Sequence, residues 1–306
     1  MQVKSPLQQL LFTTSLVQTS SSAGTAFVFV VPSGESQVYV LVSNKHVVAE
    51  RGPGSFSLAE RDSTDASGNT VKLGTRINFA DEDLARHWTG HPDPNVDVSA
   101  MFLGPFINRA AAEGKQTFFR AIGEENFPSN SAAADLDPLE PVAFVGYPNA
   151  LFDKVNLTPI ARWGHIATPV ALDYNGLPAF LIDASIFPGS SGSPVFIAQL
   201  NGYRENGTIH VGASRVMFAG LVASVHVQQD QAQLVTARPR HVVLNQLMDL
   251  GIVFNWRAVK ETVQALYAAH GFTYGSDVRP SVAPPSVAVT EEEEPPLRPD
   301  DATGRS

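Results

Sequence analysis

The stretch Asp183-Ala-Ser-Ile-Phe-Pro-Gly-Ser-Ser191-Gly-Ser-Pro-Val-Phe-Ile197 decides the fold, because it joins a cluster of small residues to an apolar run. Glycine and serine crowd around Ser191, so the backbone can turn sharply there and project the hydroxyl. The N–H groups of Gly189 and Ser191 are then placed to converge on a carbonyl oxygen that gains negative charge. The motif predicts a nucleophilic serine; a plain glycine–serine loop is the alternative.

The residues on either side of Ser191 in the chain separate two possible architectures. In the α/β-hydrolase arrangement a helix follows the serine, and the chain order is serine, acid, histidine. Here Pro194-Val-Phe-Ile197 predicts a strand, which favours the order histidine, aspartate, serine on β-barrels. His46, in Val42-Ser-Asn-Lys-His-Val-Val48, and Asp97, in Pro94-Asn-Val-Asp-Val-Ser99, supply the base and its orienting acid in that order.

The rest of the chain predicts an all-β fold with one helix near its C-terminal end. A turn at Pro32-Ser-Gly-Glu-Ser36 separates two apolar runs, and Asn-Gly pairs mark further hairpins. Apolar residues at helical spacing from Trp256 to His270 predict a helix, with Asn255 as its cap and Gly271 as its end. The expected strands and hairpins are residues 10–19, 27–31, 37–42, 142–145, 179–182, 195–197 and 216–227, with turns at 175–176, 201–202 and 206–207.

Composition excludes several classes of protein. The 306 residues contain no cysteine, which rules out a disulfide scaffold, a thiol nucleophile and cysteine-ligated metals. A net charge of −9 argues against a nucleic-acid partner, and no apolar run is long enough to span a membrane. Residues 276–306 carry seven acids, three bases and six prolines, which predicts a disordered acidic tail that could engage a regulator or partner.

Six short motifs, in order, resemble the chymotrypsin-fold (trypsin-like) serine peptidases, particularly the cysteine-free bacterial ones, over most of residues 8 to 255. They are Gly24-Thr-Ala-Phe27, Ser43-Asn-Lys-His46, Asp97-Val-Ser99, Gly146-Tyr-Pro148, the segment Asp183 to Pro194, and Gly220-Leu-Val-Ala-Ser224. The resemblance implies a serine endopeptidase with no metal or cofactor, acting on a polypeptide substrate. A catalytically silent fold relative that binds peptides, or an esterase on the same site, is the alternative.

The resemblance also implies a layout and roles. Residues 1–125 would form an N-terminal β-barrel with His46 and Asp97, 126–140 a linker, 141–255 a second barrel with Ser191, 256–271 a closing helix and 276–306 the disordered tail. Gly189 and Ser191 would form the oxyanion hole. Ser185, Ala223, Ser224, Val225 and His226 would line the substrate site, and the uncharged Ser185 predicts a preference for neutral P1 side chains.

Other features have plainer interpretations. Ser190 stands where many animal relatives have an aspartate that pairs with a newly cut N-terminus, so activation by such a cut is not expected. Arg162 is expected to serve packing or a barrel end. His87 and His91 have metal-ligand spacing but lie in a loop-like stretch. Polar residues interrupt the apolar N-terminal segment, so a cytoplasmic location is expected over a secreted or periplasmic one.

Overall fold

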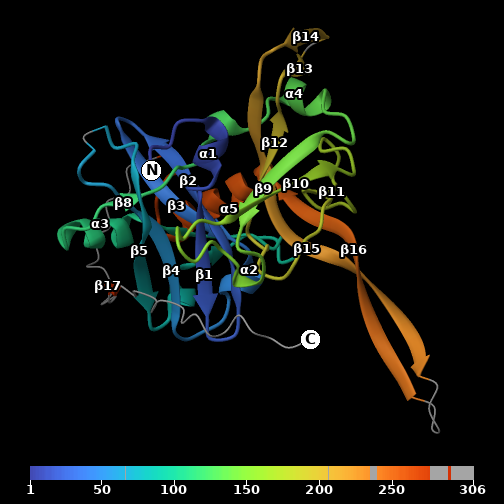
Figure 1. Ribbon diagram of the computed structural model, residues 1–306, viewed down its shortest axis with the longest axis horizontal. Helices are drawn as coiled ribbons and strands as arrows, with labels where there is room; N and C mark the ends of the chain where they lie inside the picture. Colours follow the sequence, from blue (N-terminus) through green and yellow to red (C-terminus); the bar gives the residue numbers. More distant parts are fainter. Residues whose placement is uncertain (66, 206, 235–239, 276–288, 291–306) are drawn as a thin grey trace, which may run out of the picture.

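The computed structural model describes residues 1–65, 67–205, 207–234, 240–275 and 289–290; for 224–234, 240–247 and 289–290 it describes the backbone alone. Two antiparallel sheets make up the protein, with helix α5 (Trp256–Ala269) between them and a long hairpin projecting from one side (Figure 1). The remaining helical segments are short or lie at the edges. They are α1 (Pro6–Leu10), α2 (Lys45–Val48), α3 (Gly104–Ala112), α4 (Asn130–Ala134), η1 (Leu84–His87), η2 (Glu124–Asn126) and η3 (Pro148–Ala150).

The N-terminal sheet has nine strands in the order β17-β5-β4-β1-β2-β3-β7-β6, with β8 also paired to β4. Its central strand β2 is buried almost throughout, as expected for an apolar run that is covered on both faces. The strands are β1 (Thr14–Thr19), β2 (Ala23–Ser33), β3 (Ser36–Ser43), β4 (Gly54–Arg61), β5 (Val71–Asp81), β6 (Thr89–Gly90), β7 (Ser99–Phe102), β8 (Thr117–Phe118) and β17 (Val289–Thr290).

This sheet does not confirm the first of the two barrels that the sequence predicts, because over the described residues its pairing stays open between β5 and β7. Helix α3 follows β7 directly and supplies the reason. Its Phe106 lies edge-on to Phe56 of β4, with ring centroids 5.1 Å apart, and 6.2 Å from Phe79 of β5. Side-chain packing by a helix therefore covers the gap that hydrogen bonds between strands would close in a barrel.

The second sheet is a closed six-stranded barrel in the order β10-β11-β16-β15-β12-β9. The predicted runs at 142–145, 179–182 and 195–197 all lie in it. The strands are β9 (Pro141–Gly146), β10 (Ile160–Ile166), β11 (Ala179–Asp183), β12 (Pro194–Gln199), β15 (Arg215–Leu234) and β16 (Arg240–Asn255), beside a two-stranded hairpin of β13 (Gly202–Glu205) and β14 (Thr208–Val211). β15 and β16 continue past the barrel as the projecting hairpin of Figure 1.

Helix α5 connects the two sheets through a shared core. Asn255 caps it by accepting hydrogen bonds from the N–H groups of Arg257 and Ala258, as its sequence predicts. The buried side chains of Leu266 and Tyr267 belong to one apolar cluster with Phe27 of β2 and Phe218 of β15. Because each fully buried apolar side chain contributes about 1.5–3 kcal/mol, this helix fixes how the two sheets meet.

Both ends of the chain depart from the sequence prediction. The strand expected over residues 10–19 begins only at Thr14, because Ser5 and Gln8 form a capping box with Pro6 in the first turn and start helix α1. The expected linker at 126–140 contains helix α4, capped by Ser129. Most of the predicted disordered tail lies outside the described residues, but Val289 and Thr290 pair with β5, which the prediction did not include.

Candidate functional site

His46 and Asp97 meet because the strands that carry them are paired. β3 and β7 are antiparallel with Ser43 opposite Ser99, so the residues just after Ser43 and just before Ser99 leave the sheet at one edge. His46 lies in the short helix α2 that begins there, and Asp97 lies in the loop entering β7. Strand register alone therefore brings together two residues 51 positions apart in the chain.

The aspartate holds the histidine at two points. The Asp97 carboxylate lies 2.5 Å from His46 Nδ1 through Oδ2, and its Oδ1 accepts the His46 backbone N–H at 3.1 Å. The Asn44 side chain donates to the Asp97 backbone carbonyl at 2.5 Å and fixes the loop. The imidazole is 49 % exposed and the carboxylate 28 %, so the ring is oriented by protein but open to an incoming molecule.

The loop around Ser191 depends on its glycines. Gly189 and Gly192 have φ of +82° and +85°, a backbone region that residues with a Cβ rarely adopt. A Cβ on Gly192 would also stand 1.8 Å from the Thr25 carbonyl oxygen. The sequence prediction that small residues allow a sharp turn at Ser191 agrees with this geometry.

Thr25 of β2 ties this loop to the N-terminal sheet. Its N–H donates to the Ser191 carbonyl at 2.8 Å, and its hydroxyl donates to the Gly189 carbonyl at 3.0 Å. The same hydroxyl oxygen accepts the Tyr147 N–H at 3.1 Å and the Ser193 hydroxyl at 3.3 Å, while Ser43 donates to the Thr25 carbonyl. Thr25 is fully buried, so these bonds form away from water.

A close approach at Gly24 links the Ser191 loop to the helix of His46. A Cβ at Gly24 would stand 2.6 Å from Val47 of α2 and 3.3 Å from the Ser191 carbonyl oxygen. Val47 follows His46 directly, so one glycine of β2 separates the two segments. The structure thus brings His46, Asp97 and the Ser191 loop to one edge of the N-terminal sheet.

The Ser191 hydroxyl donates to the Ala223 carbonyl of β15 at 3.0 Å. Among the described residues no hydrogen bond joins Ser191 to His46, so the structure holds the His46–Asp97 pair without a bond from the serine. The backbone N–H groups of Gly189 and Ser191 likewise donate to no partner in the described part of the chain.

The predicted substrate-site residues fall into two groups. Ser185 is exposed just beyond β11, and Ala223 is buried in β15. The side chains of Ser224, Val225 and His226 lie outside what the structure describes, so their role stays a prediction.

His87 and His91, which the sequence places at metal-ligand spacing, each lie beside a carboxylate, and the two carboxylates belong to different elements. His87 Nε2 lies 3.0 Å from Asp81, and His91 Nε2 lies 3.0 Å from Glu261 of α5. Within the described ranges no group of three or more His, Asp or Glu side chains is arranged to hold a metal ion.

Sequence reasoning assigned no site role to three of the residues that build this region. Asn44 and Ser43 lie in the quoted histidine motif, yet their partners are distant in sequence. Arg162 of β10 donates from Nη2 to Ser190 Oγ at 2.6 Å and from Nη1 to the Ser185 carbonyl at 2.7 Å. Ser190 thus accepts from an arginine, and the Met1 amine donates to the Val71 carbonyl instead.

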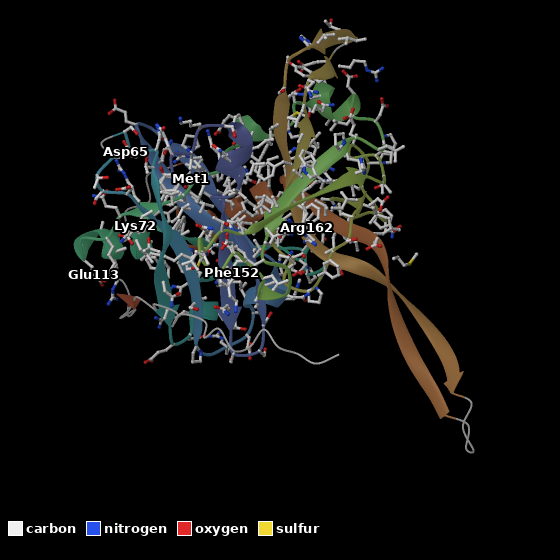
Figure 2. All side chains as sticks on the ribbon, in the orientation of Figure 1. Met1, Asp65, Lys72, Glu113, Phe152 and Arg162 are labelled. Carbon is white, nitrogen blue, oxygen red and sulfur yellow. The ribbon has the colours of Figure 1, made fainter. Side chains whose placement is uncertain are left out.

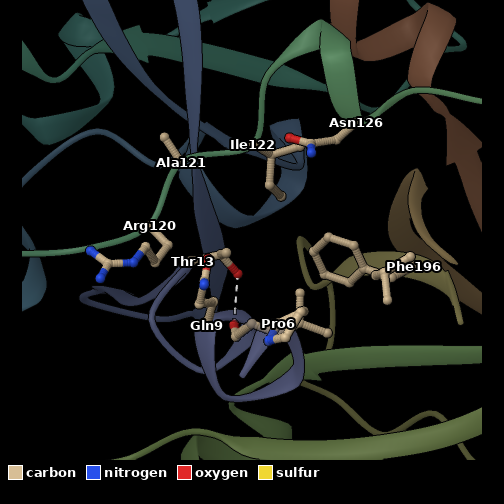
Figure 3. Close-up of a pocket in the computed structure, with 10 residues that line it drawn as sticks. Pro6, Gln9, Thr13, Arg120, Ala121, Ile122, Asn126 and Phe196 are labelled. Carbon is tan, nitrogen blue, oxygen red and sulfur yellow. Dashed lines mark hydrogen bonds between the residues drawn. The ribbon is translucent and has the colours of Figure 1, made fainter. Parts of the chain in front are cut away.

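Two hollows lie elsewhere on the molecule. A cavity of about 160 Å³ beside α1 is lined by residues that include Thr13, Ile122 and Phe196 (Figure 3). A wider groove lies between β5 and residues 150–157 and includes Arg76 and Phe152. Neither includes His46, Asp97 or Ser191. No helix in the described part of the chain has the length and apolar character needed to cross a membrane.

Comparison with known proteins gives distant matches among solved structures. No family model matches the chain, and no curated protein does. The chain is similar to a thermostable serine protease AL20 from an extremophilic microorganism, at 12% identity over 85% of this chain and 98% of that one, with a TM-score of 0.41. It is also similar to the scabies mite inactivated protease paralogue S-I1, at 10% identity over 84% and 95%, with a TM-score of 0.38. Similarities this distant carry no argument about activity, which therefore rests on the residues.

Proposed function

We propose that the protein is a serine endopeptidase that hydrolyses peptide bonds through an acyl-enzyme on Ser191. The observation that carries the proposal is the His46–Asp97 pair, 2.5 Å apart and half exposed, beside a loop whose Gly189 and Ser191 N–H groups are unused. An oriented base, a serine on a sharp turn and two free donors are what acyl transfer needs.

Each residue has one role in the proposed reaction. His46 Nε2 takes the proton of the Ser191 hydroxyl as Oγ bonds to the substrate carbonyl carbon, and Asp97 stabilises the imidazolium that forms. The Gly189 and Ser191 N–H groups hold the negatively charged oxygen of the tetrahedral intermediate. The carbon–nitrogen bond then breaks, and His46 returns the proton to the leaving amine. Water, deprotonated by His46, hydrolyses the ester and restores Ser191.

The substrate is proposed to be an extended polypeptide lying against β15. The carbonyl of Ala223 and the strand residues after it would face the substrate backbone, with Ser185 near the first side chain of the acyl part. Because Ser185 carries no charge, neutral P1 side chains are expected to be preferred over lysine and arginine. A protonated His226 would instead favour acidic ones.

A second function is favoured by one observation, the hydrogen bond from Ser191 Oγ to the Ala223 carbonyl. A serine engaged in this way suits a catalytically silent protein that binds peptides. An esterase on the same residues is the third possibility, since both chemistries pass through the same acyl-enzyme.

Labelling with a fluorophosphonate tests the proposal. The probe should modify Ser191, as mapped by mass spectrometry of the labelled peptide, and Ser191→Ala should abolish both labelling and hydrolysis. Ser131→Ala, which alters an exposed serine of α4, serves as the matched control. Turnover that persists in clean Ser191→Ala protein would refute the mechanism, and a folded wild type that resists the probe would favour the silent binder. A panel of peptides and esters then separates peptidase from esterase.

A further inference from the structure

Arg162 is a half-buried cation in an unusual setting. It lies in β10 among the strands of the closed barrel, away from Met1, Asp65 and Glu113, which are labelled on the side of the N-terminal sheet (Figure 2). Its guanidinium carbon stands 4.5 Å from the ring centre of Phe144 and 5.8 Å from that of Phe187. Burial lowers the pKa of Arg162, and among the described residues no carboxylate forms an ion pair with it. Keeping an unpaired cation out of water is unfavourable, so hydrogen bonds and ring contacts must offset the cost of desolvating Arg162.

Those contacts converge on the segment just before Ser191. Nη1 donates to the Ser185 carbonyl, and Nη2 donates to the hydroxyl of Ser190, which is fully buried. That hydroxyl in turn accepts the Phe187 N–H at 3.3 Å, while the Ser190 N–H donates to the Phe187 carbonyl at 3.0 Å. Arg162 therefore holds a closed turn over residues 187–190 at both its entrance and its end.

The turn sets the direction of the two free N–H groups. Gly189 lies inside it and Ser191 directly follows it. On the other side of the turn, the Pro188 carbonyl accepts the Asn149 N–H at 2.6 Å, which fixes the peptide plane between Pro188 and Gly189. In a trans peptide the N–H points opposite to the C=O, so the Gly189 N–H is directed away from Asn149. If the turn were loosened, the Gly189 and Ser191 N–H groups would no longer both point at the oxygen of the proposed tetrahedral intermediate.

We infer that Arg162 is a positioning residue that acts through Ser190, holding the 187–190 turn so that the Gly189 and Ser191 N–H groups converge on one oxygen. The inference rests on the proposed function for its catalytic consequence but not for the order of the turn. The planar fork of the guanidinium holds two acceptors at a fixed separation, which the single ammonium of lysine does not reproduce. The sequence predicts that Arg162 serves packing or a barrel end; its contacts with the Phe144 and Phe187 rings agree with packing, and the inferred positioning role is additional.

Arg162→Ala is expected to slow fluorophosphonate labelling of Ser191 and to lower kcat by about 10- to 100-fold, with KM little changed. The upper end is the loss of about 100-fold that a misplacement of about 1 Å can cause. Millimolar free guanidinium should restore part of the lost rate by entering the space between the two phenylalanine rings, whereas urea should not. Arg162→Lys should remain slow. The matched control is Arg120→Ala, because Arg120 also has its pKa lowered by burial and lies 4.6 Å from the ring of Phe118, away from Ser191. It should leave labelling unchanged.

Hydrogen exchange supplies a readout that needs no activity. Backbone amides over 187–191 should exchange faster in Arg162→Ala than in wild type, and no faster in Arg120→Ala. Should Arg162→Ala fail to fold, Ser190→Ala removes the same acceptor with little change of volume and should give the same two effects. In the double variant, labelling should fall no further than in either single variant.

The outcomes separate the two claims. The inference is wrong if the wild type labels at Ser191 while folded Arg162→Ala and Ser190→Ala label at the same rate and exchange no faster over 187–191. That result would leave the proposed peptidase activity unaffected. A wild type that does not label, with faster exchange in Arg162→Ala, overturns the peptidase and supports the positioning role. Equal rescue by urea and guanidinium would also overturn the role of Arg162.

Discussion

Replacing Thr25 by valine tests whether the Ser191 loop is held by the N-terminal sheet. Valine has nearly the same shape, so the change removes the hydroxyl without opening a cavity. It takes the donor from the Gly189 carbonyl, and it leaves the Tyr147 N–H and the Ser193 hydroxyl facing a methyl group. The backbone bond from Thr25 to Ser191 remains.

The magnitude follows from the groups left without partners. A buried polar group that loses its hydrogen bond costs about 1–3 kcal/mol. The Tyr147 amide is enclosed and bears this in full, whereas the partly exposed Gly189 carbonyl can bind water and the Ser193 hydroxyl can rotate. With about 1 kcal/mol more for the other two lost hydrogen bonds together, the free energy of unfolding should fall by about 2–4 kcal/mol. Release of the Gly189 carbonyl should also slow fluorophosphonate labelling by about 10-fold, the equivalent of about 1.4 kcal/mol in the barrier.

The matched control is Thr13→Val. Thr13 is also buried, beside the cavity of Figure 3, and its hydroxyl makes one short hydrogen bond, to the Leu10 carbonyl at 2.8 Å. This variant should lose about 0.5–1.5 kcal/mol and label at the wild-type rate. Urea unfolding and labelling kinetics measure both quantities. If the two variants lose equal stability and label equally fast, the reasoning that Thr25 holds the loop is wrong.

Two further predictions concern the C-terminal part of the chain. Burial raises the pKa of Glu124, but hydrogen bonds from Lys260 and Tyr274 outweigh it and leave the pKa below its ordinary value. The ionised Glu124 carboxylate therefore stabilises the fold. This contribution is present above the unfolded pKa of about 4.3 and is lost as pH falls through the folded pKa. Glu124→Gln should therefore be less stable than wild type near neutrality, with the difference shrinking in acid; a difference that grows in acid would contradict the sign. Truncation after Gly275 removes only the two-residue pairing of β17 with β5 among described contacts, so the melting temperature and short-peptide turnover should stay unchanged. A marked loss of either would show that the tail supports the folded body.

The features that the sequence predicted correctly depend on neighbours in the chain. The apolar runs became strands and the stretch after Asn255 became a helix, because period, turn residues and caps act locally. The meeting of His46 with Asp97 required one more step, the pairing of β3 with β7. The order of the motifs along the chain was enough to predict that His46 and Asp97 lie together.

The features that it missed depend on contacts between distant segments. Nothing local marks Phe106 as the side chain that covers the gap between β5 and β7, so an open sheet could not be told from a closed barrel. In the sequence, Thr25 is not distinguished from other polar residues in strands. Its hydrogen bonds with Tyr147 and Gly189 are seen only in the structure. The sequence predicted only packing or a barrel end for Arg162, because its acceptors lie 23 and 28 positions further along the chain.

The hydrogen bond from Ser191 to Ala223 bears on which of these contacts would limit the proposed reaction. The hydroxyl sits on a Cβ with three staggered rotamers, and the proposed reaction would exchange its hydrogen bond to the Ala223 carbonyl for one to the His46 imidazole. That exchange involves about 0.5–1.5 kcal/mol on each side, and exposed rotamers interconvert in picoseconds to nanoseconds. Because enzymes turn over far more slowly, the resting direction of the hydroxyl is not expected to set the rate if the protein is the proposed peptidase. The backbone of residues 187–191 has no such freedom, because an N–H that points the wrong way cannot be corrected by a side-chain rotation. The proposed activity should therefore respond to Thr25 of the N-terminal sheet and Arg162 of the barrel, which both bond to the segment 185–191, more than to any change that only alters what Ser191 bonds at rest.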